Sequence, residues 1–86
     1  MAITFTSSTS STSVTVNDTS HGALAGDFVT FSNANTGNSS LNTQLNDEFS
    51  ITSITDENSY VITLSANAAA ALSSAGSADA EYQLNV

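Results

Sequence analysis

The chain of 86 residues contains no lysine and no arginine, whereas an ordinary composition would supply about ten basic side chains at this length. Its eight acidic side chains therefore stand alone and give a formal net charge of −8. Nucleic-acid binding depends on basic side chains that neutralise phosphates, so we exclude nucleic acid as a partner. An anionic membrane surface is excluded for the same reason. Any association must use backbone pairing, apolar contact or bridging cations.

Cysteine and tryptophan are also absent, and the only histidine is His21. These absences exclude disulfides, thiolate metal sites and multi-histidine sites. A domain of this length buries only about 60–65% of the surface of its unfolded chain, so it needs additional stabilisation. Partner chains are the favoured source, with cations on carboxylates second. We therefore predict one domain over residues 1–86 that forms a homo-oligomer, with no cofactor.

We expect no secretory signal peptide and no membrane-spanning segment in this sequence. The start, MAITFTSST, lacks the basic and apolar regions of a secretory signal peptide. The longest apolar run, residues 68–72, is far shorter than a membrane span. We expect a protein that is either made and kept inside a cell or leaves it by assembly into a larger particle.

Alternation of apolar and polar residues dominates the sequence and predicts β-strands. The candidate segments are residues 2–6, 13–17, 28–31, 49–54, 60–64 and 82–86. Ile54 falls out of phase with Ile51, which predicts a β-bulge or a strand end at that point. Together with the turn residues between them, the segments indicate an all-β domain, a small antiparallel barrel or sandwich of roughly five to seven strands.

The alternation also assigns the core and leaves two stretches without a strand. The predicted core residues are Ile3, Phe5, Val14, Val16, Leu24, Val29, Ile51, Ile54, Ile62 and Leu64. Residues 68–72 are alanine-rich and predict one or two helical turns, with Gly76 as the cap. Residues 32–46 are rich in Asn, Ser, Thr and Gly, which predicts a long surface loop able to hold short strand pieces. Because lysine and proline are absent, sheet edges must be protected by carboxylates, by closure of the sheet or by a neighbour, and we favour closure or a neighbour.

The block from His21 to Asp27 predicts a tight structural turn. Gly22 and Gly26 can adopt positive φ without steric cost, so they suit a reversal on either side of Leu24. Asp27 can accept hydrogen bonds from nearby backbone N–H groups and fix the entry into the next strand. We expect His21 to make a structural hydrogen bond to the backbone.

No residue pattern in the chain indicates catalysis. Serines and aspartates are plentiful beside His21, but no nucleophile-elbow motif accompanies them. Two carboxylates could form a glycosidase pair, but the chain has no tryptophan to stack on a sugar. The acids of the turns are expected to be solvated, with a weak cation site at a loop or subunit junction as the alternative. The acids concerned are Asp18, Asp27, Asp47, Glu48, Asp56 and Glu57.

Three blocks of the sequence together resemble a β-module of tailed-bacteriophage structural proteins. The first runs from His21 to Ser32 and reads HGALAGDFVTFS, preceded by a strand that ends in Asp18-Thr19. The second reads LNDEFSITSI and the third DENSYVI. The resemblance extends from Val14 to about Leu64, with residues 80–86 matching the closing strand more loosely. Alanines 23 and 25 depart from it, standing where bulkier or more polar residues are expected.

The resemblance implies a component of a phage particle, whose partners are a major capsid protein, a tail protein or other virion proteins. We predict a non-enzymatic structural protein, first of all a capsid decoration (cement) protein on the capsid exterior. The alternative is a tail or fibre module that contacts a host receptor, for which residues 32–46 would supply a concave polar site. A third reading is a secreted adhesin-like repeat, disfavoured by the missing export signal.

Overall fold

The computed structural model describes residues 3–85, and in this range the chain forms eight β-strands and one short helix. In chain order the elements are β1 (Thr4–Ser7), β2 (Ser13–Asn17), β3 (Phe28–Asn35), α1 (Ser39–Leu45), β4 (Glu48–Ser50), β5 (Ser53–Asp56), β6 (Ser59–Thr63), β7 (Leu72–Ala75) and β8 (Ser77–Gln83). The predicted all-β class is confirmed. The strand count is higher than expected because residues 49–54 divide between β4 and β5, and because a further strand, β7, forms after residue 71.

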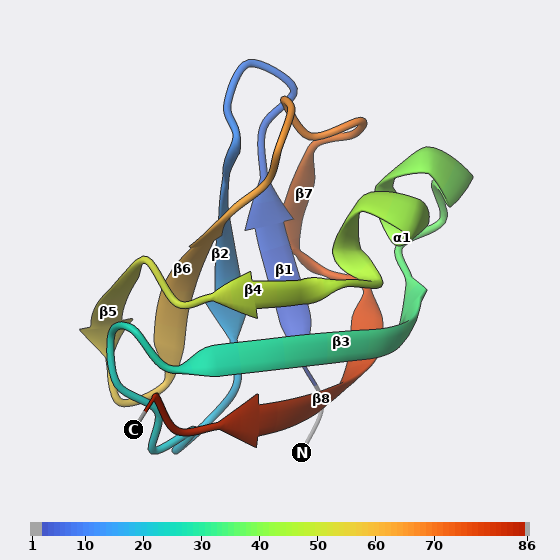
Figure 1. The fold of residues 1–86 in the computed structure, drawn as a ribbon. Helices are drawn as coiled ribbons and strands as arrows, with labels where there is room; N and C mark the ends of the chain where they lie inside the picture. Colours follow the sequence, from blue (N-terminus) through green and yellow to red (C-terminus); the bar gives the residue numbers. More distant parts are fainter. Residues whose placement is uncertain (1–2, 86) are drawn as a thin grey trace.

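The strands form two antiparallel sheets that cross each other, as Figure 1 shows. One sheet has the order β5-β6-β2-β1-β7 and the other the order β4-β3-β8. In the view of Figure 1, β1 and β2 run vertically through the molecule in opposite directions, whereas β3, β4 and β8 run across it. The architecture is therefore a small sandwich of crossed sheets.

The chain passes from one sheet to the other three times, through residues 18–27 between β2 and β3 and at two tighter corners. Gly76 alone separates β7 from β8, and a Cβ atom added there would lie 3.3 Å from the carbonyl oxygen of Asn35. Its φ of +84° also favours glycine. At the second corner, between β4 and β5, Ile51 is buried and its N–H donates to the carbonyl oxygen of Asp27. Such corners are typical of orthogonally packed sheets.

The core lies between the two sheets. Eight of the ten predicted core residues are buried, which are Ile3, Phe5, Val14, Val16, Val29, Ile51, Ile62 and Leu64. The rings of Phe5 and Phe31 meet edge to face across the sheets, with centroids 5.4 Å apart. Phe31 was missed by the sequence analysis, although it is only 2% exposed. The other unpredicted core residues are Ala23, Ala34, Leu41, Leu45, Tyr60 and Ala68.

Leu24 and Ile54 do not lie in the core as predicted. Leu24 is 66% exposed, because the turn around it is closed by polar contacts and points its side chain outward. Ile54 is only partly buried on the edge strand β5. The register between β5 and β6 shifts just after Ile54, so the predicted irregularity is present.

The helix prediction was wrong in position. Residues 68–72 form no helix. Ala68 is buried, its N–H donates to the carbonyl oxygen of Ser11, and Leu72 begins β7. The helix lies instead in residues 39–45, within the predicted surface loop. Of the predicted end strands, Ala2 and Val86 lie outside the described residues, and β8 begins earlier than expected, at Ser77.

Candidate functional site

His21 is held by hydrogen bonds at both ring nitrogens. Its Nδ1 accepts from the N–H of Ala23 at 3.0 Å, so the proton of the neutral ring lies on Nε2. Nε2 then donates to the carbonyl oxygen of Asp56 at 2.9 Å. The ring also meets Tyr60 edge to face, with centroids 5.1 Å apart. Both nitrogens are engaged in structural contacts, which leaves His21 without an unused nitrogen to act as a base.

Asp27 closes the same turn from its other end. One carboxylate oxygen accepts from the N–H of Leu24 at 3.0 Å, and the other accepts from the N–H of Asn85 at 3.1 Å. Asp27 is only 7% exposed. Gly22 and Gly26 have φ of +69° and +90°, a region that L side chains rarely adopt. The turn is thus rigid and carries the C-terminal segment on its surface.

A chain of hydroxyl groups joins the two sheets beside this turn. The Tyr82 hydroxyl on β8 donates to a carboxylate oxygen of Asp18, and it meets the Tyr60 hydroxyl on β6 at 2.9 Å. Burial raises the pKa of the Tyr82 hydroxyl well above its usual range, and the hydrogen bond to Asp18 raises it further. Burial is also the main cause of the raised pKa of Tyr60. Both tyrosines are neutral donors at ordinary pH.

The six acids considered for a cation site are dispersed. Within residues 3–85, no group of three or more His, Asp or Glu side chains lies close enough together to hold a metal ion. Asp47 accepts from the N–H of Glu48. Asp56 caps its own turn, and the N–H of Asn58, followed by the Ser59 hydroxyl, lowers its pKa. Four of these acids, Asp18, Asp27, Asp47 and Asp56, instead accept singly from backbone N–H or hydroxyl groups.

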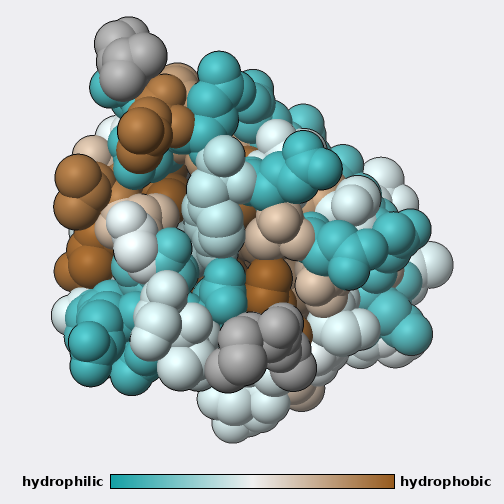
Figure 2. All heavy atoms as spheres, turned by 90° about the horizontal axis from the view of Figure 1, so that it is seen from below, coloured by the Kyte–Doolittle hydropathy of each residue, from teal (hydrophilic) through white to brown (hydrophobic). Residues whose placement is uncertain are grey.

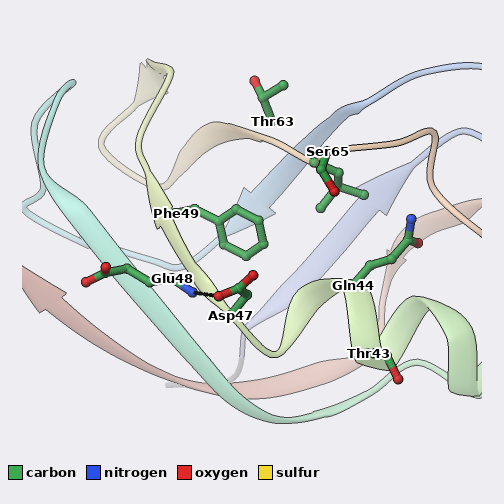
Figure 3. A pocket seen from close by; sticks show the side chains of 8 residues that line it. Thr43, Gln44, Asp47, Glu48, Phe49, Thr63 and Ser65 are labelled. Atoms are coloured by element: carbon green, nitrogen blue, oxygen red, sulfur yellow. Dashed lines mark hydrogen bonds between the residues drawn. The ribbon is translucent and has the colours of Figure 1, made fainter.

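A polar hollow of about 400 Å³ lies between α1, β4 and the chain that follows β6. Its lining residues are Thr43, Gln44, Asp47, Glu48, Phe49, Thr63, Leu64 and Ser65. Figure 3 shows the Phe49 ring, Asp47, Gln44 and Ser65 around a common space, with Glu48 and Thr43 directed away from it. Two of these residues, Thr43 and Gln44, come from the segment in which the sequence analysis placed a concave polar site.

In contrast to the polar hollow, the surface beside the His21–Asp27 turn is apolar. Leu24 and Leu84 are each 66% exposed, and Ile54 lines a shallow hollow of about 370 Å³ together with Leu24. We call Leu24, Ile54 and Leu84 the apolar surface. Figure 2, a view from below, shows hydrophobic side chains gathered along one side of the molecule. The carboxylates of Asp56 and Glu57 border the hollow.

Phe49 lies outside the segment in which a polar site was predicted, and Gln44 lies on a helix there and not on the predicted loop. The signal for that helix is the pair Leu41 and Leu45, spaced four residues apart, which matches one face of a helix. An asparagine at position 38 precedes that pair as an N-cap. Within residues 3–85, no helix is long and apolar enough to cross a membrane.

Comparison with known proteins gives a likeness in fold and none in sequence. No family model matches the chain, and no curated protein matches it in sequence. Among solved structures, the fold is similar to part of the phage phi92 endosialidase, with a TM-score of 0.75 and 22% sequence identity. The likeness covers 99% of this chain but only 12% of the endosialidase chain. At this identity it establishes the fold, a small crossed-sheet β-domain that also occurs within a much longer phage protein.

Proposed function

We propose that the chain is a non-enzymatic structural module of a tailed-phage particle, located in the tail or a tail fibre. The observation that supports this most is the likeness of the whole fold to a small part of a phage protein. The sequence resemblance between Val14 and Leu64 supports the same setting independently. A module of this kind acts by position and contact, with other virion proteins as partners.

The contacts of the ionisable residues support a role without catalysis. Both nitrogens of His21 are engaged by the backbone, and both oxygens of Asp27 accept backbone N–H groups. The remaining acids act singly. A general base or nucleophile must reach a substrate with an unengaged atom, and both polar atoms of His21 and of Asp27 are already engaged.

Capsid decoration is the second candidate, and the apolar surface favours it. Leu24 on the His21–Asp27 turn and Leu84 in the segment after β8 are both exposed, and exposed apolar side chains of this kind mark protein contacts. Such a surface would bind the protein to a capsid lattice, as a homo-oligomer or as single copies. The number of copies in a particle separates the two candidates.

The decisive experiment is quantitative mass spectrometry of purified phage particles, combined with antibody labelling in the electron microscope. For a tail or fibre module, we expect a few copies per particle at one vertex. Hundreds of copies spread over the capsid would instead establish decoration. A protein that is absent from particles would contradict both candidates.

A further inference from the structure

The polar hollow next to α1 has walls that are fixed before any ligand arrives. The Gln44 side chain is held at both ends, donating to the carbonyl oxygen of Asn67 at 3.0 Å and accepting from the N–H of Ala69 at 2.8 Å. The Thr63 hydroxyl is paired with that of Thr52 at 2.8 Å. A preformed wall reduces the entropy lost on binding.

An aromatic ring forms one face of the hollow. Phe49 is partly buried and its ring packs against that of Phe31, with centroids 6.1 Å apart. The ring is therefore held from behind while it lines the hollow in front. The face of an aromatic ring is electron-rich, so it attracts the weakly positive C–H groups of a ligand.

Polar groups with spare hydrogen-bonding capacity stand around this ring. One carboxylate oxygen of Asp47 accepts from the N–H of Glu48, and the second has no protein partner among residues 3–85. The Ser65 hydroxyl likewise has no side-chain partner in that range and lines the same space. A fixed ring with hydroxyl and carboxylate groups beside it suits a ligand that has both C–H faces and hydroxyl groups.

The negative charge of the chain favours neutral ligands over acidic ones in this hollow. No lysine or arginine exists anywhere to pair with an anionic ligand, and Asp47 and Glu48 border the hollow. A carboxylate brought beside them would be repelled without compensation. Acidic sugars are therefore disfavoured, whereas a neutral sugar meets only hydrogen-bonding groups and the ring.

We propose that this hollow, formed by Phe49, Asp47, Gln44 and Ser65, binds a neutral sugar of a cell-surface polysaccharide and rejects acidic sugars such as sialic acids. Its volume of about 400 Å³ falls at the lower end of the range for small-ligand sites. Asp47 and Ser65 hold ligand hydroxyls, and Phe49 stacks on a sugar ring. The inference rests on the proposed function only in that a fibre module would use such a site on a host.

The test is a nuclear magnetic resonance titration of the whole chain with single sugars. Methyl glycosides of glucose, galactose, mannose and N-acetylglucosamine are compared with N-acetylneuraminic acid. We expect at least one neutral glycoside to shift the backbone amides of residues 44–49 and 63–65, with no such shift for the acidic sugar. The proposal is overturned if no neutral glycoside shifts them, or if the acidic sugar binds there equally well.

Matched variants assign the binding to this hollow. Asp47→Asn keeps an oxygen for the N–H of Glu48 but removes the charge, and it should weaken binding about tenfold. Phe49→Leu should weaken it several-fold by removing the stacking face. The control is Asp56→Asn, the same change beside the second hollow, which should leave binding unaltered. An equal loss in Asp56→Asn would contradict the assignment.

The outcome is separable from that of the proposed function. Mass spectrometry of particles reports where the chain is located, whatever its ligands. A chain located in the tail that binds no neutral sugar refutes this inference alone. A chain that binds sugar at residues 44–49 but is absent from particles refutes the proposed function alone.

Discussion

The His21–Asp27 turn and the connection from Thr36 to Asn46 are fixed by the same kind of bond. In the turn, His21 and Asp27 accept from three backbone N–H groups. In the connection, Asn38, Asn42 and Asn46 also accept from three. The chain has abundant side-chain acceptors and no basic donors, so the backbone supplies the donors in both regions.

The two regions use these bonds for opposite purposes. The asparagines of the connection hold α1 so that Leu41 and Leu45 are fully buried. The turn holds Leu24 away from the core, 66% exposed. Side-chain bonds to the backbone thus position an apolar residue without deciding whether it points inward or outward. In α1, packing against the core turns the leucines inward. In the turn, the exposed Leu24 is available for contact with another molecule.

The largest expected contrast is between the losses of stability when a leucine in each region is replaced by alanine. Leu41→Ala removes a fully buried side chain and should lower the free energy of unfolding by about 2–5 kcal/mol. Leu24→Ala should change it by no more than about 0.5 kcal/mol, because the side chain is exposed. Urea denaturation followed by circular dichroism measures both. Equal losses would mean that Leu24 packs inward after all.

Removing the carboxylate of the turn should have the next largest effect. Asp27→Ala leaves the N–H groups of Leu24 and Asn85 without their acceptor, and each buried unpaired group costs about 1–3 kcal/mol. We expect a loss of about 3 kcal/mol in urea denaturation. Asp27→Asn retains one acceptor oxygen and should lose roughly half as much. A variant as stable as the parent would show that water replaces the carboxylate there.

The tyrosine pair beside the turn predicts a loss of stability in alkali. Burial raises the pKa of both hydroxyls above the unfolded value of about 10. The folded state therefore binds the two hydroxyl protons more tightly than the unfolded state does. Their contribution to the free energy of unfolding is complete below about pH 10 and is lost as the pH rises further.

Tyr60 and Tyr82 are the only tyrosines and tryptophan is absent, so tyrosinate absorbance reports these two side chains alone. We expect both to ionise together with unfolding, at higher pH than in the urea-unfolded chain. Asp18→Asn should move the transition to lower pH, because the acceptor carboxylate that raises the pKa of Tyr82 is gone. Ionisation near pH 10 or so in the folded protein would refute the raised pKa values.

The same comparison explains which parts of the structure the sequence revealed. Strands such as residues 13–17 carry their own period-2 signal, so the all-β class and most of the core were predictable. The turn was predictable because Gly22 and Gly26 have few other uses at that spacing. The outward direction of Leu24 was not, since it follows from how the polar contacts of His21 and Asp27 close the turn.

The segment around α1 was predicted as a loop because asparagine is common in loops. Asn38, Asn42 and Asn46 instead bond to the backbone N–H groups of Leu41, Thr36 and Ala34. The alanines in residues 68–72 predicted a helix where the structure has none. Helix propensity is weak, and tertiary contacts override it: Ala68 is buried in a bend that bonds to Ser11. The polar hollow was hidden because it needs three segments brought together.

The asparagine that begins α1 should contribute a smaller amount. The Asn38 side chain accepts from the N–H of Leu41 at 2.9 Å, and loss of such an N-cap costs about 1 kcal/mol. Asn38→Ala should therefore lower the free energy of unfolding by that amount, whereas Asn38→Ser should retain nearly all of it. If both variants lose equally, another contact of Asn38 provides the stabilisation.

His21 gives an effect of similar size, and it is the most diagnostic one. His21→Ala removes the acceptor for the N–H of Ala23 and the contact with Tyr60, which should cost about 1 kcal/mol in urea denaturation. His21→Asn places an oxygen where Nδ1 lies and should recover part of that loss. Neither variant should alter assembly into particles, because a residue that only holds the turn can be replaced while the fold survives. A variant that keeps the fold and stability of the parent but loses its role in the particle would show that His21 acts on a partner or a substrate.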